Sequence, residues 1–185
     1  MDLVGGIIAR LDRRSPIWAD RLRWRRTRRD DLALRVVDAL VSRGDVVVDV
    51  GASRGLFSSR MHDLVGRRGA VHAFEPNPAH HQRLQAVADD GTVTVHPAAL
   101  SDHEGTATLH VPLIDGRAYT GLASLEQRSH PSARTVIVPT LRLDDVLGPD
   151  ESLSFIKCDV EGHEDAVQEG DIGIGLWGHW PTRYC

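Results

Sequence analysis

The chain has 185 residues, of which 41% are hydrophobic and 26% are charged, and its formal net charge is −4. These values are ordinary for a folded globular protein, and the length suits one domain with a real core rather than two. Two cysteines argue against a disulfide framework, and no apolar run approaches the ~20 residues that a bilayer-spanning helix needs.

The first 43 residues are predicted to form an Arg-rich helical segment. Residues 10–29 hold nine arginines, so a basic arm precedes an acidic body. Residues 3–11 have apolar side chains on one face of a helix, and Trp18 and Leu22 continue an apolar stripe in a second helix. The arm either touches anionic lipid or nucleic acid, or is a helical cap with solvated arginines. We favour the cap, because no nucleic-acid-binding motif accompanies the arginines.

Alternating helices and strands follow this segment. Helices are predicted over residues 30–42, 54–65, 78–89 and 141–147, and core strands over residues 46–50, 70–75, 92–96 and 153–158. The expected buried face of the first of these helices comprises Ala33, Val36, Val37, Leu40 and Val41. Residues 104–140 are predicted to form an inserted hairpin or long loop beside the sheet. The alternation implies an α/β fold with a doubly wound, mostly parallel sheet.

The first core strand runs directly into a loop with two glycines. Val46–Val50 is β-branched apart from Asp49, which suits a strand buried on both faces. Gly51 and Gly55 let the backbone turn sharply and approach a ligand closely, and the amides that open the next helix face a negative group. The stretch is typical of the first strand-to-helix turn of a nucleotide-cofactor domain.

Acidic residues stand at or just beyond the ends of all four core strands: Asp49, Glu75, Asp102, and Asp159 with Glu161. In open α/β sheets the ligand lies beyond the carboxyl ends of the strands, so these acids are expected to converge. Glu75 can accept hydrogen bonds from both hydroxyls of a ribose, in NAD and in S-adenosylmethionine alike. The G-x-G-x-x-G fingerprint is absent, and an Asp at the start of the loop would repel a pyrophosphate but suit an ammonium and a sulfonium. S-adenosylmethionine is therefore favoured over NAD.

Between residues 45 and 170 the chain carries five stretches in order: VVVDVGASRGLFS, HAFEPNP, AALSD-x-x-G, TLRLDDVL and FIKCDVEGHE. Together they resemble the successive motifs of the FkbM-type methyltransferases. These are class I S-adenosylmethionine-dependent enzymes, mostly O-methyltransferases that act on sugar or natural-product hydroxyls. The resemblance implies a Rossmann-like methyltransferase domain over residues 44–170.

The resemblance also implies which residues bind the cofactor. Asp49, Gly51 and Gly55 would contact the methionine part, with Ala52 in the same loop among the cofactor-binding residues. Glu75 would contact the ribose. Ser101 and Asp102 would lie by the adenine.

The fourth core strand is predicted to carry the chemistry. Lys157, Asp159 and Glu161 alternate and so share one face of the strand. Methyl transfer is an in-line displacement that depends on positioning, and a carboxylate that takes the acceptor's proton adds a further ~10²–10⁴-fold. Asp159 or Glu161 is the predicted base, or the ligand of a metal that lowers the hydroxyl's pKa; no dedicated metal site is predicted. Lys157 is expected to be a structural ion-pair partner, and His80 with His81 a solvated helix face.

Residues 171–185 are predicted to be an irregular tail. They hold three glycines and two of the four tryptophans, with neither helical nor strand period. Members of the resembled family continue with elements that complete the sheet and the acceptor pocket. We therefore expect a sheet that is incomplete after its fourth core strand, in an apparently truncated chain with a marginally stable or partner-dependent fold.

Several functions remain open on this basis. The lead is a methyltransferase with a small-molecule or glycan hydroxyl acceptor, and the rivals are an inactive cofactor-binding fragment and, less favoured, a nicotinamide-dependent oxidoreductase. A nucleic-acid partner is not expected. The arm is expected to make at most weak contact with a membrane surface. Asp2 stands where a leader peptide would carry positive charge, so we expect a cytoplasmic protein.

Overall fold

The computed structural model describes residues 6, 8, 10–11, 15–27, 32–88, 90–120, 123–125, 132–148 and 151–160. Its helices are α2 (Pro16–Thr27), α3 (Leu32–Leu40), α4 (Leu56–Val65), α5 (Pro78–Gln85) and α6 (Leu143–Val146), with a 3₁₀ turn at Gly66–Arg68. Its strands are β1 (Val46–Val50), β2 (Ala70–Phe74), β3 (Val93–His96), β4 (Ala99–Leu100), β5 (Gly105–Ile114), β6 (Arg117–Ala118), β7 (Ala133–Leu141) and β8 (Leu153–Cys158). No helix among these described residues combines the length and the apolar composition needed to cross a lipid bilayer.

Some predicted features fall outside this part of the chain. Most of the helix predicted over residues 3–11 does, and so do Glu161 and the tail at residues 171–185. The boundaries proposed at residues 43 and 170 stay predictions.

The four predicted core strands are confirmed, each to within one residue, and they form one parallel sheet in the order β3-β2-β1-β8. The chain adds β2 and then β3 on one side of β1, and returns to place β8 on its other side. The strand order therefore reverses between β1 and β8. In doubly wound folds a ligand binds at such a reversal, beyond the carboxyl ends of the strands.

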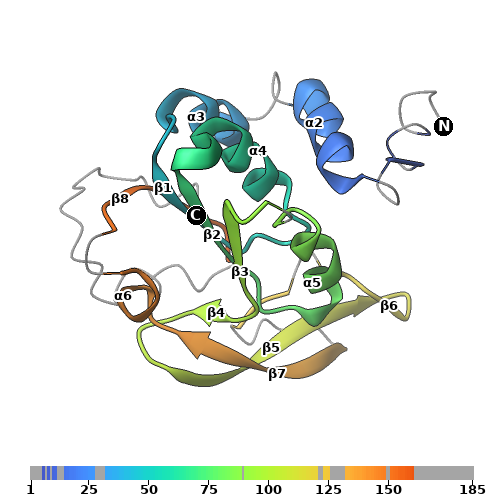
Figure 1. The fold of residues 1–185 in the computed structure, drawn as a ribbon. Helices are drawn as coiled ribbons and strands as arrows, with labels where there is room; N and C mark the ends of the chain where they lie inside the picture. The colour runs from blue at the N-terminus through green and yellow to red at the C-terminus, as the bar shows by residue number, and fades with distance from the viewer. Residues whose placement is uncertain are drawn as a thin grey trace.

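Both faces of this sheet are covered, as the β-branched sequence of β1 predicts. The face that carries Val47 packs against helices α2 to α5, with Trp24, Leu34, Met61 and Leu84 in the shared core. The opposite face packs against α6 and β4 through a second cluster formed by Val48, Val50, Phe74, Leu100 and Leu143. Figure 1 shows α3 and α4 stacked over the strands.

The first two described helices bury other side chains than the sequence predicts. In α2, Trp18 is 57% exposed whereas Trp24 is 3% exposed, because Trp24 packs edge-on against Phe57 of α4. In α3, Leu34 is buried and Leu40 is 56% exposed. The helix face that packs on the core is the one that carries Leu34, and it is rotated relative to the predicted face. The expected stripes were wrong at Trp18 and Leu40, and also at Ala33, which is exposed.

Residues 99–141 contain all four strands of a second sheet, where the sequence predicts only a hairpin or long loop. Its order is β4-β7-β5-β6, with β5 and β7 antiparallel and β4 parallel to β7. It has a small core of its own, formed by Leu109, Val111 and Val138. In Figure 1 this sheet lies below α5 and α6, at the base of the molecule.

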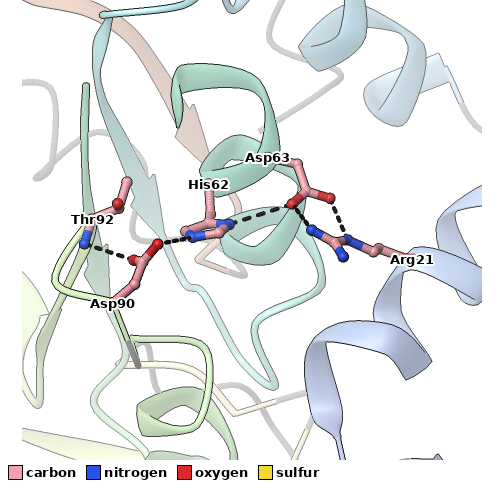
Figure 2. Close-up of polar contacts among 5 residues, drawn as sticks. All are labelled: Arg21, His62, Asp63, Asp90 and Thr92. Carbon is pink, nitrogen blue, oxygen red and sulfur yellow. Dashed lines mark hydrogen bonds and ion pairs between the residues drawn. The ribbon is translucent and has the colours of Figure 1, made fainter. Parts of the chain in front are cut away.

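A chain of polar contacts ties α4 to its neighbours (Figure 2). Arg21 of α2 donates two hydrogen bonds to the carboxylate of Asp63, with Nε 2.8 Å from Oδ2. The ring of His62 lies between two carboxylates, with Nδ1 3.4 Å from Asp63 Oδ1 and Nε2 2.9 Å from Asp90 Oδ2. Asp90 also accepts a hydrogen bond of 3.0 Å from the amide of Thr92, just before β3. The contacts thus run from α2 across α4 to the turn that leads into β3.

Candidate functional site

A pocket lies beyond the carboxyl ends of β1 and β2, at the reversal of strand order. Strands β1 and β2, the loops that follow them and helix α5 contribute Val50, Gly51, Ser53, Phe74, Glu75 and His80. The second sheet and its loops contribute Leu100, Leu109, Ser124 and Leu125. The residues just after β8 contribute Asp159 and Val160. Among the residues predicted from sequence, Gly51, Glu75 and Asp159 line this pocket. Walls from both sheets therefore enclose it.

Gly51 allows the loop to pass close to β8. Its φ is +71°, and a Cβ at this position would overlap the backbone carbonyl oxygen of Asp159. The amides of Gly51 and Ala52 both donate to the carbonyl of Phe74, at 3.0 and 2.9 Å. The loop is thus fixed between the ends of β2 and β8, in a conformation that a side chain at position 51 would prevent.

The other loop residues shape the turn, and of these only Ser53 lines the pocket. Gly55 has φ +86°, and a Cβ there would come within 3.0 Å of Leu84 and Val87. Ala52 is 4% exposed. Ser53 adopts φ +50°, a conformation that non-glycine residues rarely take, and its amide points to Glu75. Neither Ala52 nor Gly55 lines the pocket, so their predicted contact with a ligand stays a prediction.

Glu75 is held rigidly at the wall of the pocket. Its side chain is buried, and its Oε2 accepts a hydrogen bond of 2.6 Å from the amide of Ser53. Oε1 accepts one of 2.8 Å from the amide of Asn77. A carboxylate has about four lone-pair sites. Each oxygen therefore keeps one position for a hydroxyl of a ligand.

Asp49 lies behind the loop, on the face of β1 that α4 covers. It is fully buried, and its Oδ2 accepts a hydrogen bond of 2.6 Å from the hydroxyl of Ser58. The Nζ of Lys157 is 3.0 Å from Asp49 Oδ1 and donates to the carbonyls of Val50 and Gly51 at 3.2 and 3.0 Å. Lys157 thus joins the end of β8 to the glycine loop, the structural role expected of it. Asp49 positions the loop, and its direct contact with a ligand stays a prediction.

Asp159 stands at the mouth of the pocket. Its side chain is 61% exposed, and its Oδ2 lies 3.8 Å from Nζ of Lys157. Its amide donates to the carbonyl of Val50 at 3.1 Å, which continues the pairing of β1 with β8 past the end of the strand. Within the described residues no group of three or more side chains could hold a metal ion.

Ser101 and Asp102 lie beside the pocket rather than in its wall. The amide of Ser101 donates to the carbonyl of Leu141 at 2.9 Å, and its hydroxyl donates to Asp102 Oδ1 at 3.0 Å. The His103 ring, 2.6 Å from the same oxygen, and the Ser101 hydroxyl lower the pKa of the Asp102 carboxyl. Leu100, immediately before Ser101, lines the pocket instead. The predicted contacts of Ser101 and Asp102 with adenine stay predictions.

The prediction of a solvated helix face at His80 was wrong. This residue is 5% exposed and lines the pocket. Asn77 caps α5 by accepting a hydrogen bond of 3.1 Å from the amide of Ala79, and this cap turns the first residues of the helix toward Glu75. His80 lies four residues before the fully buried Leu84, and so on the same helix face. That spacing is the sequence signal that identifies it.

Comparisons with known proteins identify one family that matches this chain. A model described as the methyltransferase FkbM domain matches residues 49–174. A solved FkbM methyltransferase from Methylobacillus flagellatus KT is 24% identical with a TM-score of 0.44, over 68% of this chain and 28% of that one. Aeropyrum pernix fibrillarin, solved with natively bound S-adenosyl-L-methionine, is 26% identical with a TM-score of 0.31, over 32% of this chain and 26% of that one. The chain thus matches only about a quarter of either relative, and no curated protein matches it.

Proposed function

The chain belongs to the FkbM family of methyltransferases, and on that premise we propose that it binds S-adenosylmethionine and methylates a hydroxyl of a sugar or natural-product acceptor. The observation that carries the proposal is the carboxylate of Glu75. Two backbone amides fix it in the wall of a pocket at the reversal of strand order, 22 residues beyond the Ser53 that binds it. A buried acid in this place suits the two hydroxyls of a ribose.

The other residues of the pocket fit the same cofactor. Val50, Phe74 and Leu100 supply apolar surface of the kind on which an aromatic base packs. Gly51 lets the loop backbone approach the ligand without a side chain in between. The cofactor, when bound, supplies an electrophilic methyl group on a sulfonium, and the chain's own residues bind and orient it.

Asp159 is the candidate base for the acceptor hydroxyl. It stands at the mouth of the pocket, where its Oδ2 lies 3.8 Å from Nζ of Lys157. A hydroxyl bound at the mouth would give its proton to this carboxylate as the methyl group is transferred. Glu161, the other candidate, lies outside the described residues.

Titration calorimetry with S-adenosylmethionine tests the cofactor. Replacement of Glu75 by Gln should weaken binding by about 10- to 100-fold, because hydrogen bonds to a charged acceptor are worth about 1.5–3 kcal/mol. The exposed Glu104 provides the matched control, since Glu104→Gln removes the same charge away from the pocket. Binding of NAD but not of S-adenosylmethionine would overturn the proposal in favour of an oxidoreductase.

Turnover is the second readout of the same experiment. With an acceptor found by screening sugars and natural-product alcohols, Asp159→Asn should lower kcat by roughly 10²-fold while leaving cofactor affinity unchanged. Full turnover by this variant would remove Asp159 from the chemistry. Cofactor binding without turnover on any acceptor would favour an inactive cofactor-binding fragment.

A further inference from the structure

His80 carries a buried ring nitrogen that the rest of the described chain does not satisfy. Its side chain is 6% exposed and lines the pocket, yet Nδ1 has no hydrogen-bond partner among the described residues. Leaving a buried polar atom unpaired is costly, and most such atoms in folded proteins are bonded to protein or to ordered water. An unpaired nitrogen in a pocket wall therefore points to a ligand group or a water in front of it.

The carboxylate oxygen Oε1 of Glu75 lies 3.5 Å from this nitrogen. That separation exceeds the 2.7–3.2 Å typical of protein N–H···O bonds. Oε1 already accepts a hydrogen bond from the amide of Asn77 and keeps a free lone pair. The His80 nitrogen and the Glu75 oxygen thus lie side by side in the same wall, one able to donate and the other able to accept.

We propose that His80 and Glu75 together form a clamp for one ribose hydroxyl of the cofactor. The hydroxyl oxygen accepts a hydrogen bond from Nδ1–H of His80, and the hydroxyl hydrogen is donated to Oε1 of Glu75. The clamp requires a group that both donates and accepts a hydrogen bond, so it distinguishes a hydroxyl from an ether, a hydrogen atom or a carboxylate. The inference rests on the proposed function, because it needs a ribose in the pocket, and it adds His80 as a residue that determines specificity.

The test is calorimetry with S-adenosylhomocysteine and its 2′-deoxy and 3′-deoxy analogues. His80→Phe keeps an aromatic ring but removes both nitrogens, whereas His80→Asn places an amide near the position of Nδ1. The exposed Gln82 lies on the same helix, so Gln82→Ala is the matched control. All variants are first compared by thermal melting, and if His80→Phe fails to fold, His80→Asn with the deoxy analogues carries the test.

We expect the wild-type protein to bind one deoxy analogue roughly tenfold more weakly than S-adenosylhomocysteine, as the loss of a hydrogen bond predicts. His80→Phe should bind S-adenosylhomocysteine about tenfold more weakly and no longer discriminate against that analogue. His80→Asn should recover most of both effects, and Gln82→Ala should behave as wild type.

Two outcomes overturn the clamp while leaving the proposed function intact. In the first, His80→Phe binds S-adenosylhomocysteine as tightly as wild type. In the second, it weakens binding of all three ligands by the same factor, which means that His80 only supports the wall or holds a water. Failure of the wild-type protein to bind S-adenosylhomocysteine at all is a different result, and it overturns the proposed function itself.

Discussion

Gly51 combines two demands that can be separated by experiment: a positive φ and a close approach to backbone. Its φ is +71°, and a Cβ there would overlap the carbonyl oxygen of Asp159. Gly116, in the turn between β5 and β6, has φ +72° with nothing within 4 Å of its Cβ position. The two positions share the backbone conformation and differ in the overlap.

Gly51→Ala should therefore destabilise the protein more than Gly116→Ala. The control costs only the left-handed conformation, about 1–2 kcal/mol, whereas Gly51→Ala must also move the loop away from β8. Urea unfolding measures the difference, and titration with S-adenosylmethionine should show lost affinity for Gly51→Ala alone. Equal losses of stability with unchanged affinity would mean that the loop relaxes freely.

Sequence reasoning identified site residues where a side chain or a glycine has a local signature. Gly51 and Glu75 are such cases, because the first follows the β-branched strand β1 and the second follows β2, and both line the pocket. His80 was missed because histidine is polar and two of them are adjacent, which outweighed the four-residue spacing from Leu84 that places His80 on the buried face of α5. Asp49 is buried beneath α4 and paired with Lys157. This position depends on how β1, α4 and β8 pack together, so the sequence around Asp49 does not predict it.

At the scale of elements, the network around His62 predicts how α4 responds to pH (Figure 2). The hydrogen bond to Asp63, with the one to Asp90, raises the pKa of His62 above its usual value. The ring, in turn, is the first cause that lowers the pKa of Asp90 to about 2, and Arg21 and the ring hold the pKa of Asp63 well below its usual range. Both carboxylates are therefore charged at any pH above about 5, and His62 is the member of this network whose pKa, raised above 6.5, governs its response at higher pH.

The sign follows from the raised pKa. A histidine that binds its proton more tightly in the folded state contributes stability that is fully present below the unfolded pKa, near 6.5, and is lost as the pH rises through the folded pKa. His62→Gln should therefore cost about 0.5–1 kcal/mol at pH 6 and less at pH 8.5, the size expected of a partly exposed ion pair. Urea unfolding of both proteins at the two pH values measures this difference. A cost that grows with pH would show that His62 acts as a neutral hydrogen-bonding group.

The pKa of His96 is shifted in the opposite direction to that of His62. Burial, with the neighbouring His72, lowers the pKa of His96 to about 4. Its ring lies over Phe74, with centroids 4.4 Å apart, and its Nε2 is 3.1 Å from Nδ1 of His72. The unfolded state takes up the proton first, so this residue costs stability as the pH falls from about 6.5 toward 4. The pH dependence of wild-type stability thus combines the two histidines, and only the His62 variant isolates the first.

The core strands could be predicted from sequence because their signal is local. Short runs between turn residues, β-branched in β1 and β3 and largely apolar in β2 and β8, predict the four strands to within one residue. The second sheet was reduced to a hairpin because one of its strands, β4, has only two residues and pairs with β7 some forty residues later. Such pairing leaves no pattern in a short window. The same reason explains the error at Trp18 and Leu40, where contact with α4 decides which face is buried.

At the scale of the whole molecule, the pocket lies between two sheets that differ in how fully they are packed. The parallel sheet is packed on both faces, whereas the second sheet is held by a small cluster of Leu109, Val111 and Val138. Ile137 on β7 is 68% exposed, which leaves part of that sheet uncovered within the described residues. A region with few buried apolar contacts opens locally at lower cost than a well-packed core. We therefore expect β5 and β7 to exchange amide hydrogens faster than β1 and β2 in the absence of ligand.

A ligand that binds in the pocket should remove much of this difference. Leu109 and Ser124 line the pocket from the second sheet, and the backbones of Ser124 and His110 exchange two hydrogen bonds, of 3.0 and 2.8 Å. S-adenosylmethionine held against Glu75 would therefore rest on β5 as well, and a ligand that binds only the folded form slows opening of every segment it contacts. Hydrogen-exchange mass spectrometry should show slower exchange over residues 105–114 together with residues 50–55 and 74–80. The helix α3 contributes nothing to the pocket and is the internal control. Protection confined to residues 50–80 would show that the cofactor does not touch the wall formed by the second sheet. That wall would then be available to bind the acceptor.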